Sequence, residues 1–367
     1  MRLFSAWLLL LLGAASAVAS SERKLTVVSW GGPYEQAQRQ AILDPFTKET
    51  GIEISVLEYD GTPASIAARA EAEGWDLIDM TEFDAISACD DGLLLPLNGE
   101  EIVIPSPGIG VQEDFVKRAF RKCTVAQNVY ASVIAFNVEM FPGVKPSRVE
   151  DLFNIEAFPG KRAIQRSPND ILEWVLLAEG VPPGQVYDLL STDRGLRLAF
   201  RRLDEMREHI VWWDTVDEPA RLLAERKVSM ASGFNGRFFA SAYQEGQPIS
   251  IIWDGRLIGH EVWGIAWNSD QVEEAKQLLA YATSPERLAA LSEIIPYGPT
   301  RRSAMMRVGL GGEANIPMLD HLPNSPKHGQ RSLTLDSGWY ANTEALRSRR
   351  FNAWLEAGQE QGAAPQQ

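Results

Sequence analysis

The alternation of strand and helix patterns near the start of the chain constrains its fold most. Strands are expected at 25–30, 52–56 and 75–80, and helices at 34–50 and 63–73. Parallel strands need a crossover connection, usually a helix, so this order predicts a parallel sheet covered by helices. Open sheets of this kind bind ligands beyond the carboxyl ends of their strands. Residues 30–34 and 81–84 occupy such positions.

The same alternation continues through the rest of the chain. Further strands are expected at 128–137, 210–213, 228–231, 249–253 and 262–267, and helices at 170–180, 185–208, 270–292 and 339–357. Residues 358–367 are polar and give no reason to expect order. A length of 367 residues argues for two domains, each large enough to bury its own core.

The first nineteen residues have the pattern of a secretory signal peptide. Arg2 precedes an apolar stretch at 3–12, and small residues at 14–19 predict cleavage after Ala19. The apolar stretch is too short to span a bilayer. The two cysteines, Cys89 and Cys123, are an even number in an exported chain, so a disulfide is their natural pairing, with two buried free thiols as the alternative.

Charge and motif content exclude several classes of function. The chain has 35 Lys and Arg against 49 Asp and Glu, so its formal charge is −14 and nucleic acid is not expected as a partner. Ligands with a cationic end are compatible with this charge. The sequence has no recognised catalytic or nucleotide-binding motif, and its four histidines have no metal-ligand spacing, so no cofactor or metal is predicted. An exported hydrolase that uses a pair of carboxylates remains the alternative, because such pairs leave no sequence signature.

Several short motifs, in order along the chain, resemble one protein family. They are the Ser29-Trp30-Gly31-Gly32-x-Tyr34 turn and the segments 48–52, 75–79, 89–97, 135–137, 158–162, 233–237, 261–265 and 297–299. Together they resemble the spermidine/putrescine-binding branch of the periplasmic solute-binding proteins of ABC importers. The resemblance covers about residues 25–345.

The resemblance implies a fold, a location and partners. The fold is an α/β, two-lobe periplasmic binding protein of the type II-like class, each lobe a mainly parallel sheet flanked by helices, with a hinge between the lobes. The expected ranges are 20–132 and 270–300 for lobe 1, and 133–268 and 301–357 for lobe 2. The protein would act in the periplasm as a monomer that is not an enzyme. It would deliver a small amine-containing solute to a membrane permease and its ATPase.

The resemblance also implies the ligand-binding residues, because family pockets hold amino groups with carboxylates and clamp methylene chains between aromatic rings. The matching positions are Trp30, Tyr34, Glu82, Phe234, Glu261 and Tyr297. Three of them have alternatives: Trp30 as core packing, Glu82 as a helix N-cap partner and Glu261 as a surface strand residue.

Arg237 departs from the family pattern, since polyamine binders usually have an acidic residue near this position. A guanidinium does not bind an ammonium but grips a carboxylate with two parallel hydrogen bonds. If Arg237 and Glu261 both face the cleft, the ligand carries a carboxylate and an amine, as 4-aminobutyrate does. The alternative is that Arg237 pairs with a neighbouring carboxylate and leaves a polyamine pocket for putrescine or spermidine.

Overall fold

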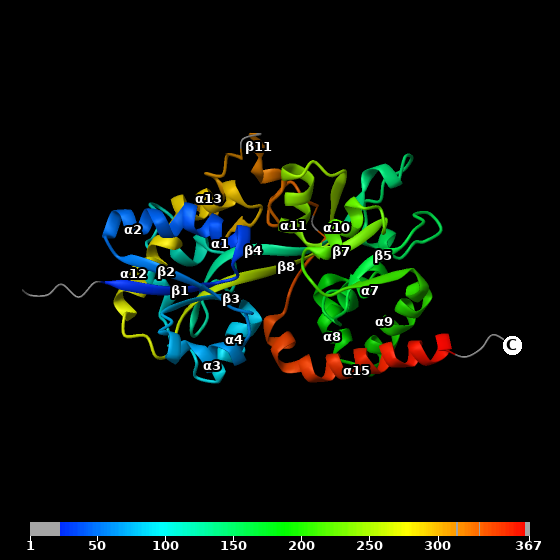
Figure 1. Cartoon of the computed structure of the whole chain (residues 1–367), viewed down its shortest axis with the longest axis horizontal. Helices are drawn as coiled ribbons and strands as arrows, with labels where there is room; N and C mark the ends of the chain where they lie inside the picture. The colour runs from blue at the N-terminus through cyan, green and yellow to red at the C-terminus, as the bar shows by residue number, and fades with distance from the viewer. Residues whose placement is uncertain (1–22, 313–314, 330, 364–367) are drawn as a thin grey trace, which may run out of the picture.

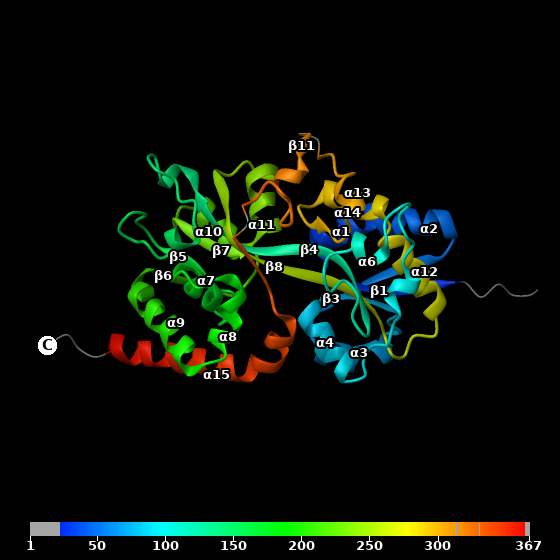
Figure 2. The ribbon, with the colours of Figure 1, turned by 180° about the vertical axis from the view of Figure 1, so that it is seen from behind.

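A computed structural model describes residues 23–312, 315–329 and 331–363, so the expected signal peptide lies outside the described residues. The chain forms two halves along its longest axis, joined by the long strands β4 and β8 (Figures 1 and 2). A ten-stranded sheet runs through both halves. Its main order is β2 (Glu53–Glu58), β1 (Lys24–Ser29), β3 (Leu77–Thr81), β8 (Ile249–Ile265), β4 (Thr124–Asn137), β7 (Met230–Phe234), β5 (Arg162–Gln165) and β6 (Ile210–Trp213). The short strands β9 (Gly298–Pro299) and β12 (Ser332–Thr334) pair with β4 and β8, while β10 (Leu310–Gly311) and β11 (Ile316–Pro317) pair with each other.

The first half confirms the predicted parallel opening. Strand β1 pairs in parallel with both β2 and β3, and helices connect them. Pro45 cannot donate a backbone hydrogen bond inside a helix, and the predicted helix is indeed divided before it. The pieces are α1 (Gly32–Gln38), a π-helical turn (Arg39–Leu43) and α2 (Asp44–Thr50). The other helices here are α3 (Pro63–Glu73), α4 (Glu82–Asp90), α5 (Gly99–Ile102), α6 (Val111–Asp114), α12 (Val272–Ala282), α13 (Pro285–Ile294) and α14 (Arg302–Met305).

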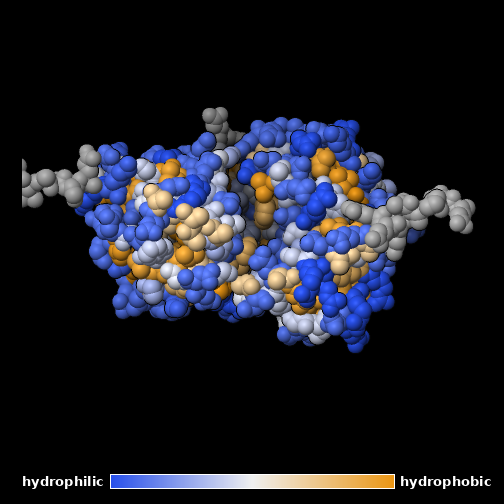
Figure 3. All heavy atoms as spheres, turned by 60° about the horizontal axis from the view of Figure 1, so that its bottom comes forward, coloured by the Kyte–Doolittle hydropathy of each residue, from blue (hydrophilic) through white to orange (hydrophobic). Residues whose placement is uncertain are grey.

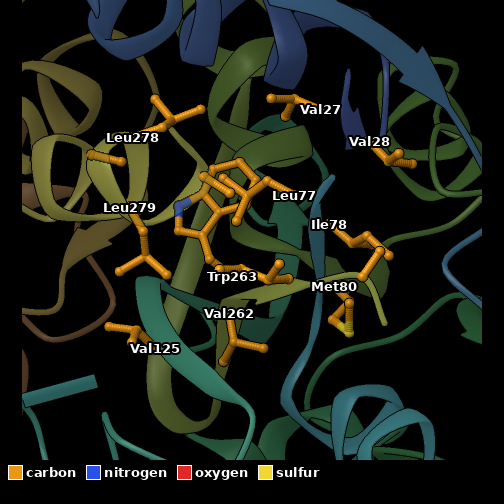
Figure 4. Close-up of a cluster of buried hydrophobic side chains, with 14 of the residues drawn as sticks. Val27, Val28, Leu77, Ile78, Met80, Val125, Val262, Trp263, Leu278 and Leu279 are labelled. Atoms are coloured by element: carbon orange, nitrogen blue, oxygen red, sulfur yellow. The ribbon is translucent and has the colours of Figure 1, made fainter. Parts of the chain in front are cut away.

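Each half has its own hydrophobic core. The core of the first half combines side chains from 25–126 with others from 262–291, and Figure 4 shows Trp263 of β8 at its centre between Leu77 and Leu279. The second half holds two clusters, drawn from 131–257 together with 333–354. The helices of this half are α7 (Ile171–Ala178), α8 (Val186–Leu190), α9 (Asp193–Met206), α10 (Glu218–Ala224), α11 (Asn235–Phe239) and α15 (Ser337–Ala363).

The two strands expected at 249–253 and 262–267 are in fact one continuous strand, β8. It pairs antiparallel with β4 over most of its length, with register shifts near Ala126 and Ser132. Glycine permits the join: Gly255 has φ +73°, and a Cβ there would lie 2.7 Å from Val149. Residues 254–261, which lie between the two predicted strands, therefore belong to the part of β8 that crosses between the halves.

The final helix is longer than the sequence predicts. The polar tail was expected from residue 358, but α15 continues to Ala363. Arg207 packs against the helix just before this extension, since its guanidinium lies 3.8 Å from the centre of the Trp354 ring and donates a hydrogen bond to the Trp354 carbonyl. A Cβ at Gly358 would lie 1.8 Å from Arg207 Nη1, so glycine lets the helix pass this side chain.

Cys89 at the end of α4 and Cys123 before β4 form the predicted disulfide, with their Cα atoms 5.9 Å apart. Within the described ranges, no helix is long and apolar enough to cross a membrane.

Candidate functional site

A cavity of about 360 Å³ lies between the two halves, which is within the usual size of small-molecule sites, about 300–1,000 Å³. The space-filling view shows the surface hollowed between the halves, with hydrophobic residues in the hollow (Figure 3). Six of the seven predicted ligand-binding residues line the cavity, and Glu82 does not. The lining residues are Trp30, Gly31, Tyr34, Thr81, Phe83, Tyr130, Ser132, Gln165, Asn169, Asp170, Val216, Phe234, Arg237, Glu261, Tyr297, Leu335 and Tyr340.

The turn after β1 brings Trp30 and Tyr34 to the cavity. Gly31 makes the turn possible, because it has φ +72° and a side chain there would collide with Glu58 at 2.3 Å. Trp30 packs against Tyr59, with the ring centres 5.7 Å apart, so it is both a partly buried packing residue and a cavity wall. The Tyr34 hydroxyl donates a hydrogen bond to Asp79 and accepts one from Asn128, each at 2.8 Å, which fixes the ring.

Glu261 reaches the cavity from β8, where it pairs with Thr81 of β3. Its Oε2 atom is buried and has no hydrogen-bond partner among the described residues, and the same holds for the indole nitrogen of Trp30. Burial raises the pKa of Glu261 well above its usual value, and the negative charges of Asp79 and Asp84 raise it further. A buried carboxyl without a counterion is costly, so this position favours a ligand that brings a positive charge.

The second half supplies Phe234 and Arg237 from the end of β7 and the start of α11. Asn235 anchors this turn: its side-chain oxygen accepts from the Ala131 amide at 3.0 Å, and its nitrogen donates to the Pro296 carbonyl at 2.6 Å. The second bond places the turn against Tyr297. A Cβ at Gly236 would lie 2.9 Å from the Tyr297 ring, so glycine allows the close approach.

Arg237 both lines the cavity and pairs with Asp217, at 3.0 Å. The pairing that the sequence left open as an alternative therefore exists. However, the Asp217 side chain is 75% exposed and that of Arg237 is 37% exposed. Exposed ion pairs of this kind contribute about 0–1 kcal/mol, so Asp217 does not prevent Arg237 from binding a carboxylate in the cavity.

Glu82 was expected in the pocket, and the structure places it elsewhere. It begins α4 and is 4% exposed. Its carboxylate accepts hydrogen bonds from Arg121 and Ser337, both at 2.6 Å, and lies 3.6 Å from His260 Nδ1. Burial raises its pKa, but the contacts with His260 and Ser337 and the charge of Arg121 outweigh burial and lower the pKa to about 2. The negative charge of Glu82 is thus already balanced by other side chains of the protein.

Asp170 lines the cavity and was missed by the sequence analysis. It precedes α7 without capping that helix, at φ 67° and ψ −49°, and the Ile171 amide donates to the Asn169 carbonyl at 2.7 Å. This is a classic γ-turn, a rare and strained geometry that a non-glycine residue keeps only when its surroundings impose it. Burial raises the pKa of Asp170 to about 6, against the opposing effects of Ser132 and Arg347. An acid at a helix start looks like an ordinary cap, so the sequence carried no distinguishing signal.

The cavity therefore combines two kinds of charge with aromatic walls. Glu261 lies on the side of β3 and β8, Arg237 lies on α11, and Asp170 lies at the start of α7. Aromatic pairs line the space between them, with ring centres 5.6 Å apart for Tyr34 and Tyr297 and 6.0 Å apart for Tyr130 and Phe234. Among the described residues, no group of three or more His, Cys, Asp or Glu side chains could hold a metal ion. The arrangement suits binding of a small ligand that has both charged and apolar parts.

Comparisons with known proteins agree with this geometry. A family model described as bacterial extracellular solute-binding protein matches residues 41–306. The chain is 30% identical over 347 residues to the gamma-aminobutyric acid-binding protein of Pseudomonas aeruginosa, covering 94% of each. It is 22% identical over 322 residues to spermidine/putrescine-binding periplasmic protein 1 of Haemophilus influenzae, covering 85% of each.

A solved structure shows the same fold. An ABC transporter substrate-binding protein from Bradyrhizobium japonicum has a TM-score of 0.77 to this chain at 28% identity, covering 90% of this chain and 99% of that one. The resemblance and the two-lobe α/β fold expected from the sequence are thereby confirmed, and the chain belongs to the bacterial extracellular solute-binding protein family.

Proposed function

We propose that this protein captures a small zwitterion with an amine at one end and a carboxylate at the other, for which 4-aminobutyrate is the probe. One observation carries the proposal: Glu261, which has no ion-pair partner among the described residues, and Arg237 line the same cavity from opposite halves of the molecule. An ammonium at Glu261 and a carboxylate at Arg237 form charge-assisted hydrogen bonds, which are stronger than neutral ones. The methylene groups between them lie against Tyr34, Phe234 and Tyr297.

The relative that binds gamma-aminobutyric acid, by its name, supports this choice. A diamine such as putrescine is the second candidate, because Asp170 provides another carboxyl on the cavity wall. In that case the second amine lies at Asp170 and Arg237 stays with Asp217. Binding of 4-aminobutyrate therefore depends on Arg237, whereas binding of putrescine depends on Asp170.

The transport cycle follows from the position of the ligand. A ligand that contacts Glu261 and Arg237 bridges the two halves only when they are closed, so it stabilises the closed state by its differential affinity. The moving units are close to the lobes expected from the sequence, 20–132 with 270–300 and 133–268 with 301–357. The boundary differs in β8, because Val262, Trp263, Ile265 and Ala266 pack in the core of the first half and not in that of the second. After export and removal of residues 1–19, the closed monomer delivers its ligand to a permease and ATPase in the membrane.

Titration calorimetry of residues 20–367 with 4-aminobutyrate, putrescine and spermidine tests the proposal. The wild type is expected to prefer 4-aminobutyrate. Arg237→Ala should weaken this ligand about 100-fold and leave putrescine within about threefold, because only the carboxylate loses its partner. Asp170→Asn is the matched variant and should have the smaller effect on 4-aminobutyrate. A preference for putrescine that depends on Asp170 and not on Arg237 would select the diamine.

Recovery of chemically unaltered ligand after prolonged incubation separates a binding protein from a hydrolase.

A further inference from the structure

A second cavity, of about 560 Å³, lies between the two halves on the other face of the crossing strands. Successive side chains of a strand point to opposite faces of its sheet. Tyr130 of β4 and Glu261 of β8 accordingly line the ligand cavity, whereas Val129 and His260, which are paired across the same two strands, line the second cavity. The crossing strands β4 and β8 are therefore a wall that the two cavities share.

Opposite charges line the two sides of this second cavity. Lys117 and Arg118 follow α6 in the first half and are exposed, whereas Asp188 belongs to α8 in the second half (Figure 2). Asp336, also on the second side, precedes α15, and its carboxylate accepts a hydrogen bond from the Trp339 amide at 3.0 Å. Within the described ranges, none of the four charged side chains in the cavity wall forms an ion pair. Their charges therefore act across the cavity.

Closure of the ligand cavity moves these charges apart. Because the two cavities share a wall, a rotation of the halves about β4 and β8 that narrows one cavity widens the other. Opposite charges attract more weakly as their distance grows, and a ligand that binds the closed state binds more weakly when that state is less populated. We infer that Lys117, Arg118, Asp188 and Asp336 favour the open state of the ligand-free protein and thereby set the affinity of a cavity that none of them lines. The inference rests on the closing motion of the proposed function and applies equally to an amino acid and a diamine.

The double variant Lys117→Glu/Arg118→Glu tests this, because it replaces the attraction across the second cavity by repulsion. Calorimetry at low ionic strength should show 4-aminobutyrate, or putrescine if that is the ligand, bound about threefold more tightly than by the wild type. At about 1 M salt, where the screening length is about 3 Å, the two affinities should converge. Lys48→Glu/Lys122→Glu is the matched control, since it changes the net charge equally in the same half at residues that line neither cavity, and it should leave the affinity unchanged. Weaker or unchanged binding by the Lys117→Glu/Arg118→Glu variant, or equally tight binding by the control, would overturn the inference.

Asp188→Lys approaches the same attraction from the second half. In the wild type it cancels the charge of the acidic side and should tighten binding, whereas in the Lys117→Glu/Arg118→Glu background it removes the repulsion and should weaken binding. An effect of net charge alone has the same sign in both backgrounds and would contradict the inference. If the Lys117→Glu/Arg118→Glu variant does not fold, Asp188→Lys alone should still tighten binding, and an unchanged affinity rejects the inference. Failure of the wild type to bind any amine would refute the proposed function, whereas binding that these variants do not alter would refute this inference only.

Discussion

Glu82 lies just after the end of β3 and Glu261 lies within the neighbouring strand β8, and the sequence assigns both the same role. Glu82 follows Thr81, which is directly opposite Glu261. Yet Glu82 points toward His260 and is held by Arg121 and Ser337, whereas Glu261 faces the cavity and forms no ion pair with any residue that the structure describes. The pKa of Glu82 is accordingly lowered and that of Glu261 is raised. The comparison shows that the neighbours of a buried carboxylate, not its place on a strand, decide whether it stabilises the fold or is available to bind a ligand.

The largest expected effect is the loss of binding in Glu261→Gln. Removing one partner of a buried charge pair costs about 2–5 kcal/mol, so the affinity for 4-aminobutyrate or putrescine should fall about 30-fold or more. Thermal unfolding of the free protein should show no loss of stability, since the removed carboxyl forms no ion pair with the described residues. Calorimetry on Glu82→Gln provides the control. An affinity of Glu261→Gln within about threefold of the wild type would break the comparison.

Glu82→Gln should show the opposite pattern. The variant loses a charged partner of Arg121 and Ser337, and its free energy of unfolding in urea should fall by about 2 kcal/mol. Ligand affinity should change by less than about fivefold, because Glu82 does not line the cavity. A loss of ligand affinity with unchanged stability would contradict this and would show that Glu82 contributes to ligand binding.

The two acids should also respond to pH with opposite signs. The lowered pKa of Glu82 gives a stabilisation that is present above pH 4.5 and is lost as the pH falls toward 2. The raised pKa of Glu261 gives a cost that appears as the pH rises above 4.5. Unfolding free energies measured from pH 3 to 8 should therefore converge for wild type and Glu82→Gln at low pH, and diverge for wild type and Glu261→Gln at high pH. Each slope is at most about 1.4 kcal/mol per pH unit. Parallel curves would contradict the assignment.

The smallest expected effect is the release of a fraction of a proton on binding. An ammonium beside Glu261 favours its ionised form, so binding expels the proton held there and the affinity rises with pH. The pKa values of Asp79 and Asp170 are raised to about 7 and about 6, and Asp84 and Arg237 add nearby charge. Calorimetry at pH 6 in buffers of different ionisation heat measures the release, and Glu261→Gln isolates the share of Glu261. Uptake of a proton would reverse the expected sign.

Much of the site was predictable because its residues sit in turns with recognisable patterns. Trp30 and Tyr34 follow the first strand, so their place at a strand end could be read locally. Phe234 at the end of β7 and Arg237 in α11 were found through the family resemblance and the departure from it. Asp170 could not be read in this way, because its strained turn depends on packing around α7. The length of β8 was also hidden, because residues 253–256 have no pairing partner on β4 and the strand continues across this irregularity.

The sequence by itself determined the α/β class and the parallel opening, which follow from local periodicity, and it favoured a disulfide between the two cysteines. The residue types that a charged, small ligand needs came from the family resemblance and from the chemistry of each side chain. Only the tertiary structure decided which charges are already satisfied and which are free. Arg121, Ser337 and His260 are brought to Glu82 across long stretches of chain, whereas within the described part of the chain nothing hydrogen-bonds to Glu261 Oε2. A carboxylate's protonation depends on burial and on charges within a few ångströms, and those distances are set by the folded chain alone.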